Sequence, residues 1–286
     1  MADIFIKYPG DKNTPIGPFN CCIYCGNNET NRTDEHAVPE ALGGRLILKN
    51  ASCPTCQKAI DPFESRCHNQ MFAAVRAHLG FKTTKSQGRK GRYPVSVTRG
   101  GKREKVLIPI EDHPTMLHLV SFAPPGILFD QPPSKDFKDT RWWAWSLGEQ
   151  HEFDGKLGRL QKTINFAEIR LDGVFLANSF GRYLAKIAHC SAIAHFGLDS
   201  FRPMLLDIIL KEDAPVAYLV GCESAGMPAH EKAPHFELSF GCMADLQTNH
   251  ILLCATVRLF AWLETPIYLI VIGEPGPKIL RELTNM

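Results

Sequence analysis

Two C-x-x-C pairs, Cys22/Cys25 and Cys53/Cys56, constrain the fold of this chain more than any other feature of its sequence. Two residues between cysteines let one tight turn present both thiolates to the same tetrahedral metal ion, and a second such turn closes the site. Since four cysteines leave no open coordination position, we expect a structural Zn²⁺ ion that holds two segments of the chain together. Cys21 is an alternative to Cys22, although the three residues between Cys21 and Cys25 make a wider turn.

The other cysteines favour a protein without disulfides. Five of them are scattered singly, at Cys67, Cys190, Cys222, Cys242 and Cys254, and in a reducing compartment such cysteines are usually small core residues. The first ten residues lack the apolar stretch of a secretion signal. The longest apolar stretches, 251–263 and 267–272, are shorter than the ~20 residues that cross a bilayer. We therefore expect a cytoplasmic protein with no membrane partner.

Positive charge is concentrated in the front part of the chain. Residues 1–105 contain 17 Lys and Arg against 9 Asp and Glu, whereas residues 106–286 contain 15 against 21. A basic surface indicates a polyanionic partner, because Lys and Arg contact phosphates without regard to base sequence; a solvated charged loop is the alternative. The densest basic stretch provides the candidate nucleic-acid-binding residues Lys82, Lys85, Arg89, Lys90, Arg92, Arg99, Lys102, Arg103 and Lys105.

The segment between the two cysteine pairs predicts two strands. Asp34-Glu35-His36 is followed by Pro39, then by Gly43-Gly44 and the apolar run Leu46–Leu48. Short apolar runs separated by proline and a pair of glycines are typical of a strand, a loop and a second strand. The acidic residues and the histidine would then lie at the end of the first strand.

A helix is expected after the second cysteine pair. Asp61 has the chemistry of an N-cap, Pro62 suits the first helical position, and Glu64 completes a capping box. Apolar residues then recur at helical spacing until Leu79, where Gly80 provides a stop signal. The order of elements in this part of the chain is therefore ββα.

This order and the run EHAVPEALGG…LKNASCPTC resemble the HNH endonucleases of the His-Me finger (ββα-metal) superfamily. The resemblance is to a bacterial subgroup with the signature E-H-x-x-P-x-x-L-G-G and two C-x-x-C knuckles. It continues through Phe63-Glu64 and the basic stretch, and more loosely to Leu184–His189. It implies a treble-clef-like module that hydrolyses DNA phosphodiester bonds with a catalytic Mg²⁺ or Mn²⁺ ion.

The chemistry of hydrolysis suits the residues at the end of the first strand. Water must be deprotonated near neutral pH, a task that fits imidazole with its ordinary pKa of about 6.5, and a hard cation must offset phosphate charge. The resemblance implies that His36 is the general base and Glu35 a ligand of the catalytic metal. Asp34 is the reserve ligand, because a shift of one residue reverses the face of a strand. Alternatively, His36 is a zinc ligand or an ordinary turn histidine.

The remaining catalytic positions match the family less well. Asn50 is the only asparagine available to brace the catalytic loop, and otherwise it ends the strand in solvent. Relatives often have Asn or His after the last knuckle cysteine, where this chain has Gln57, a poor ligand for a hard metal. If the helix begins at Pro62, Glu64 and His68 share one face. His68 is therefore the first candidate for the third catalytic and metal-binding residue and Glu64 the second; a helix cap and a solvated histidine are the alternatives.

The back half of the chain is expected to be α+β. Apolar residues on all sides predict a buried helix over 176–196, ended by Gly197. Short apolar segments at 235–242, 251–263 and 266–272, with turns between them, predict a C-terminal antiparallel meander. The overall fold class is therefore α+β, with the zinc-stapled ββα module in front.

Composition divides the chain into three parts. The ββα module occupies 19–81, a basic loop 82–105, and an α+β domain of unknown role 106–286. Within the last part, the Pro-rich stretch 123–136 suggests a connector. The segment Arg141–Trp145 holds three of the four tryptophans, either as a core nucleus or as a platform for base stacking.

Three hypotheses for function follow from these features. The first is a metal-dependent HNH endonuclease that acts on DNA. The second is a catalytically inactive zinc module that binds nucleic acid or a protein partner, which the mismatches at Asn50 and Gln57 support. The third is a redox or other zinc-cysteine protein. The C-terminal domain could serve a homodimer or a partner in a defence system, and no recognition helix indicates a target sequence.

Overall fold

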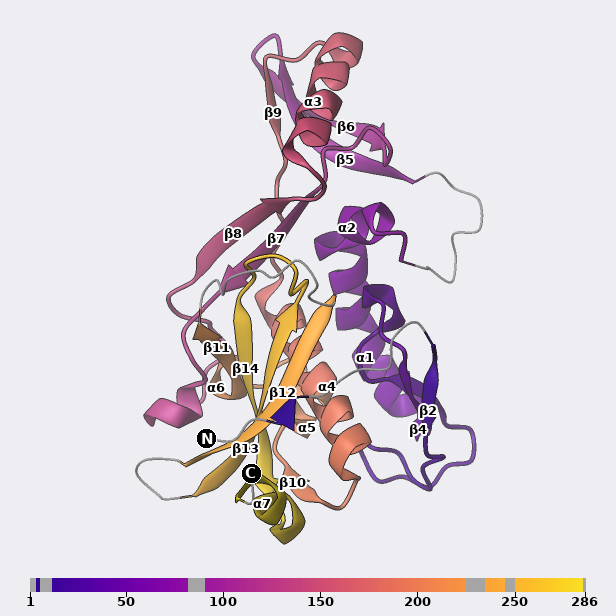
Figure 1. Ribbon diagram of the computed structural model, residues 1–286, viewed down its shortest axis with the longest axis vertical. Helices are drawn as coiled ribbons and strands as arrows, with labels where there is room; N and C mark the ends of the chain where they lie inside the picture. The colour runs from indigo at the N-terminus through magenta and orange to yellow at the C-terminus, as the bar shows by residue number, and fades with distance from the viewer. Residues whose placement is uncertain (1–3, 6–11, 82–90, 225–234, 245–249, 285–286) are drawn as a thin grey trace.

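The computed structural model describes residues 4–5, 12–81, 91–224, 235–244 and 250–284 (Figure 1). Helices and mainly antiparallel strands together form the α+β fold that the sequence predicts. Within these ranges, no helix is both long enough and apolar enough to cross a membrane.

The module that contains the cysteine pairs is a small three-stranded sheet followed by a helix. β3 (Thr33–His36) pairs antiparallel with β4 (Leu46–Ser52), and β2 (Thr14–Ile16) pairs parallel with the other edge of β4. A short 3₁₀ helix, Glu40–Leu42, lies in the loop between β3 and β4. α1 (Pro54–Arg66) follows β4 almost directly. The predicted order of two strands and a helix is confirmed.

The helix of this module begins earlier than predicted. α1 starts at Pro54, so the expected start at Asp61 is wrong, and Pro62 lies inside the helix. An internal proline costs a helix roughly 3 kcal/mol. Burial of one large apolar side chain stabilises a fold by about 1.5–3 kcal/mol, and both Ile60 and Phe63 are buried on this turn. Their packing is therefore sufficient to keep the helix continuous through the proline.

The C-terminal end of the helical segment agrees with the sequence. α1 continues into a π-helical turn, Cys67–Met71, and then into α2 (Ala73–His78). Gly80 follows with a φ of 68°, a left-handed conformation that glycine adopts at low steric cost. Because the helix does not begin at Asp61, the capping-box role considered for Glu64 does not apply.

The described part of the expected basic loop is a β-hairpin. β5 (Arg92–Arg99) and β6 (Lys102–Pro109) pair antiparallel, and β9 (Glu168–Arg170) pairs with the other edge of β5. α3 (Gln150–Ile164) packs on one face of this sheet around a small core of its own, which includes Val95, Val97, Ile108, Leu160 and Phe166. Residues 92–99 and 102–109 are therefore strands, and alternate valines of β5 are buried under α3.

A long two-stranded ribbon joins this small sheet to the rest of the molecule (Figure 1). It consists of β7 (Met116–Ser121) and β8 (Arg141–Ser146), with the Pro-rich connector and the 3₁₀ helix Gly126–Phe129 between them. The tryptophans of β8 do not form a fully buried nucleus. Trp142 is 56% exposed, whereas Trp143 and Trp145 are half-buried and their rings stack with centroids 6.4 Å apart.

The C-terminal part contains the predicted long helix and the predicted meander. α4 (Ala177–Phe196) is buried along most of its length and ends at Gly197. β12 (Phe236–Ala244), β13 (Ile251–Leu259) and β14 (Ile267–Pro275) pair antiparallel in sequence order. The other described elements of this region are β1 (Ile4–Phe5), β10 (Phe201–Pro203), β11 (Val220–Ser224), α5 (Leu206–Leu210), α6 (Val216–Leu219) and α7 (Pro277–Thr284).

One hydrophobic core connects the front module to the C-terminal sheet. It includes Phe63 of α1, Leu184 and Ile187 of α4, and Phe240 and Ile270 of the sheet. α4 lies between α1 and the sheet, as Figure 1 shows. The domain boundaries predicted at 81 and 105 remain predictions, but the core extends across them. This central position of α4 determines the surroundings of the candidate site.

Candidate active site

The four cysteines of the two C-x-x-C pairs come together in the structure. The sulfur atoms of Cys22, Cys25, Cys53 and Cys56 all lie within 4.8 Å of one another. The Sγ atoms of Cys25 and Cys53 are 3.6 Å apart, close to the ~3.8 Å that tetrahedral coordination with Zn–S bonds of about 2.3 Å requires. Cys21 is not part of the group. Four sulfur donors and no fifth ligand fit a structural zinc ion rather than a catalytic one.

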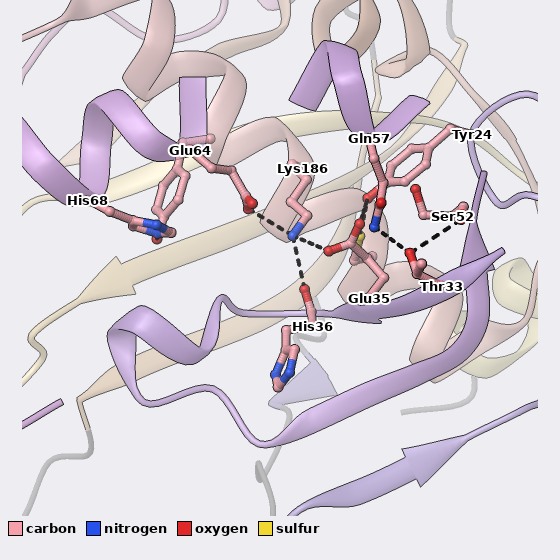
Figure 2. A network of polar contacts seen from close by, with 11 residues as sticks. Tyr24, Thr33, Glu35, His36, Ser52, Gln57, Glu64, His68 and Lys186 are labelled. Carbon is pink, nitrogen blue, oxygen red and sulfur yellow. Dashed lines mark hydrogen bonds and ion pairs between the residues drawn. The ribbon is translucent and has the colours of Figure 1, made fainter. Parts of the chain in front are cut away.

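Glu35 and His36 point to opposite sides of β3. Glu35 is 8% exposed and faces α1 and α4, whereas the His36 ring lies on the other side of the strand (Figure 2). This follows from the alternation of side chains along a strand. The His36 Nδ1 atom is buried and has no hydrogen-bond partner among the residues that the structure describes. The candidate base and the candidate metal ligand therefore do not share one face.

A buried lysine from α4 neutralises Glu35. Lys186 Nζ lies 2.6 Å from Glu35 Oε1 and 2.8 Å from Glu64 Oε1, and it donates a third hydrogen bond of 3.2 Å to the main-chain carbonyl of His36. The hydroxyl of Tyr24 donates to Glu35 Oε2 at 3.1 Å. Burial alone would lower the pKa of Lys186, but the two carboxylates raise it above its ordinary value. The two carboxylates therefore favour the charged form of the lysine.

The candidate ligands of a catalytic metal do not converge. The Asp34 carboxylate pairs with Lys49 and accepts a 3.0 Å hydrogen bond from the main-chain N–H of Asn50. The His68 Nε2 atom lies 2.9 Å from the hydroxyl of Tyr183, and burial lowers the pKa of His68 to about 3. In the part of the chain that the structure describes, the four cysteines are the only group of three or more His, Cys, Asp or Glu close enough to hold a metal.

The two other positions considered from the sequence have local partners. Asn50 adopts a left-handed conformation with a φ of 58°, and its side chain donates a 3.1 Å hydrogen bond to the carbonyl of Phe19. It therefore joins the end of β4 to the segment before the first cysteine pair. Gln57 donates to the hydroxyl of Thr33 at the start of β3. In the described arrangement neither side chain contacts His36.

The loose resemblance at Leu184–His189 pointed to α4, but sequence analysis did not predict the contacts that this helix makes in the site. His189 Nε2 lies 3.1 Å from the carbonyl of Ile23 between the first two cysteines, and its ring stacks on Tyr24 with centroids 5.6 Å apart. Arg182 donates to the carbonyl of Ala59 in α1 at 3.2 Å. A further signal was Lys186 itself, because a lysine flanked by apolar residues in a buried helix requires a counter-charge.

The described basic residues separate onto two faces of the hairpin. Residue pairing places Lys105 opposite Ser96 and Arg103 opposite Thr98, on the face away from Val97 and α3. Arg92 lies on the same face, and Arg170 joins it from β9 through its pairing with Ser96. Arg99 and Lys102 lie on the other face. The predicted contacts at Lys82, Lys85, Arg89 and Lys90 lie outside the described residues.

Comparison with known proteins identifies the front module. Residues 22–82 match the family model described as HNH endonuclease, so this part of the chain is an HNH endonuclease domain. The match contains both cysteine pairs, His36 and α1, and it ends before the hairpin. No curated protein and no solved structure matches the chain.

Proposed function

We propose that the HNH domain hydrolyses phosphodiester bonds in DNA, with His36 as the general base. The observation that carries this proposal is the position of His36 in the domain matched at 22–82, at the end of β3. Its main-chain carbonyl is held by Lys186, and its Nδ1 atom has no hydrogen-bond partner among the described residues. The hydrogen bond from Lys186 therefore positions the backbone at His36, and the Nδ1 atom of the ring forms no hydrogen bond with the described residues.

The exposed face of the β6–β5–β9 sheet supports DNA as the substrate. Arg92, Arg103 and Lys105 are exposed there; Arg170 also lies on this face, where it forms an ion pair with Glu168. Positive side chains on one face provide the sequence-independent part of DNA affinity. We propose this face as the phosphate-contacting surface.

The arrangement of carboxylates does not fit a catalytic divalent cation. Such an ion would offset charge on the phosphate and on the departing oxygen. Glu35 and Glu64 both face the ammonium group of Lys186, and the carboxylate of Asp34 faces Lys49. The family resemblance alone therefore supports a metal ligand at Glu35.

A second candidate function is a catalytically inactive zinc module that binds nucleic acid. The buried Lys186–Glu35 pair favours it, because a charge-neutralised carboxylate stabilises the fold instead of holding a catalytic ion. In this function the four cysteines would still bind structural zinc, and the exposed face of the β6–β5–β9 sheet would still contact phosphates. His36 would then be an ordinary strand-end residue.

Nicking of supercoiled plasmid separates the two functions. The zinc-loaded wild type, His36→Ala and His151→Ala are each tested with added Mg²⁺, added Mn²⁺ and neither ion. His151 is an exposed histidine of α3 and provides the matched control. Nicking by the wild type and the control, with loss in His36→Ala, supports the nuclease. If no variant nicks the plasmid while all bind it, or if His36→Ala nicks as fast as the wild type, the proposed role of His36 is wrong.

A further inference from the structure

Two acidic side chains from different elements meet inside the HNH domain. Glu35 comes from β3 and Glu64 from α1, and one oxygen of each lies within 2.8 Å of the same nitrogen atom. The Glu35 side chain is 10% exposed and that of Glu64 is 18% exposed. Two carboxylates this close in a poorly solvated place repel each other strongly unless a cation lies between them. The fold therefore requires a positive charge at this point.

Lys186 meets that requirement with all of its donors. An ammonium group has three N–H donors, and the three acceptors within reach are Glu35 Oε1, Glu64 Oε1 and the carbonyl oxygen of His36 (Figure 2). All three acceptors are oxygen atoms, which are also the donors that Mg²⁺ and Mn²⁺ prefer. The distances of 2.6, 2.8 and 3.2 Å are those of hydrogen bonds. Coordination of Mg²⁺ needs about 2.0–2.1 Å.

We infer that Lys186 is the resident cation of the Glu35–Glu64 pair, so that the native HNH domain does not bind a divalent cation between these two carboxylates. The ammonium group reaches the pair from α4, outside the matched segment 22–82. Lys186 is 1% exposed, and its helix is anchored on both sides of the site through Arg182 and His189. The lysine is therefore part of the packed core and not a side chain that a solvent ion displaces.

The charge balance predicts what happens when the lysine is removed. With both carboxylates ionised, the pair and the ammonium carry a net charge of −1, whereas the two carboxylates alone would carry −2, a charge that favours uptake of a proton or of a cation. A divalent cation would neutralise that charge with the same oxygen ligands. Lys186→Met keeps an unbranched side chain that is one atom shorter and removes its charge. We therefore expect this variant to gain a site for a hard divalent cation, which can enter from the partly exposed side of Glu64.

Binding of Mn²⁺, followed by electron paramagnetic resonance of the free ion, tests the inference on the zinc-loaded full chain. In the wild type we expect no Mn²⁺ binding that depends on Glu64, so wild type and Glu64→Gln give the same titration. In Lys186→Met we expect about one further equivalent of Mn²⁺. Its affinity should be at least about tenfold higher than that of any Mn²⁺ binding by the wild type. The variant Lys186→Met/Glu35→Gln/Glu64→Gln should return to the wild-type titration, since both charges have been removed.

Two results would overturn the inference. One is wild-type Mn²⁺ binding that is lost in Glu64→Gln; this comparison does not depend on whether Lys186→Met folds. The other is a folded Lys186→Met variant that binds Mn²⁺ no better than the triple variant. Lys162→Met, at an exposed lysine of α3, controls for the loss of one positive charge elsewhere. The measurement contains no DNA, so its outcome is independent of the proposed nuclease activity.

Discussion

The Nζ atom of Lys186 lies 2.6 Å from Oε1 of Glu35, although one residue belongs to the middle of α4 and the other to the strand between the two cysteine pairs. The lysine side chain is 1% exposed and the glutamate side chain 10% exposed. A charge at this depth is costly unless an opposite charge compensates it. The HNH domain therefore depends on a helix outside the matched segment for the neutrality of its own acidic residue.

Removal of the buried ammonium should destabilise the whole protein. We expect Lys186→Met to lower the free energy of unfolding by about 3–5 kcal/mol, because Glu35 and Glu64 are left without their counter-charge. The variant that also replaces both glutamates with glutamine should recover most of this loss, since no buried charge remains. Urea denaturation followed by circular dichroism measures both values. Equal stability of Lys186→Met and the wild type would contradict the role assigned to this pair.

The zinc site should be required for the fold of the front module. Ile23 and Tyr24, between the first two cysteines, are buried and contact His189 of α4. Cys53→Ser should therefore lose its zinc and lower the thermal unfolding temperature, because both the cysteine turn and its contact with α4 are loosened. Elemental analysis and a thermal melt give the two readings. Cys21→Ser, outside the sulfur cluster, should keep its zinc. A zinc-free Cys53→Ser protein with the same unfolding temperature as the wild type would contradict a structural role for the zinc ion.

Stability should fall on acidification because of two buried histidines. Burial lowers the pKa of His68 to about 3 and that of His189 to about 4, against about 6.5 in an unfolded chain. Between these values the unfolded state binds protons that the folded state does not bind, so the free energy of unfolding decreases as pH falls. Each histidine contributes a slope of up to about 1.4 kcal/mol per pH unit.

The variant His68→Gln should have a smaller slope than the wild type between about pH 6.5 and pH 4. Glutamine can still form a hydrogen bond with the hydroxyl of Tyr183, so the packing around this position is largely kept. Urea denaturation at a series of pH values measures the slope. His151→Gln, at an exposed position of α3, is the matched control. An unchanged slope in His68→Gln would show that His68 does not contribute to the pH dependence of stability.

The two faces of the hairpin should differ in their effect on DNA binding. Lys105→Ala removes a positive charge from the face away from α3, whereas Lys102→Ala removes one from the opposite face. For each phosphate contact that is lost, the slope of log K against log salt should decrease by about 0.9. Fluorescence anisotropy of a labelled duplex over a range of NaCl concentrations measures it. We expect this decrease for Lys105→Ala alone. Equal slopes for both variants would show that the face away from α3 is not the phosphate-contacting surface.

Sequence patterns were sufficient for those parts of the fold that depend on near neighbours. The spacing of the cysteine pairs predicts the sulfur cluster, because each turn is made by consecutive residues. Apolar periodicity likewise predicts α4 and the meander of β12, β13 and β14. The start of α1 was missed, because local capping signals at Asp61 were weaker than the burial of Ile60 and Phe63 in the tertiary fold.

In the candidate site, the sequence predicted the motif but not the partners of its acidic residue. The motif around His36 identified the HNH domain, and strand alternation already allowed Glu35 and His36 to face opposite sides. Only the tertiary structure decided what Glu35 faces, because its partner Lys186 reaches it through the docking of α4 against β3 and α1. Spacing along a chain determines which ligands a short turn can bring together. The counter-charge of a buried carboxylate depends on which helix packs over it, and that is a property of the assembled core.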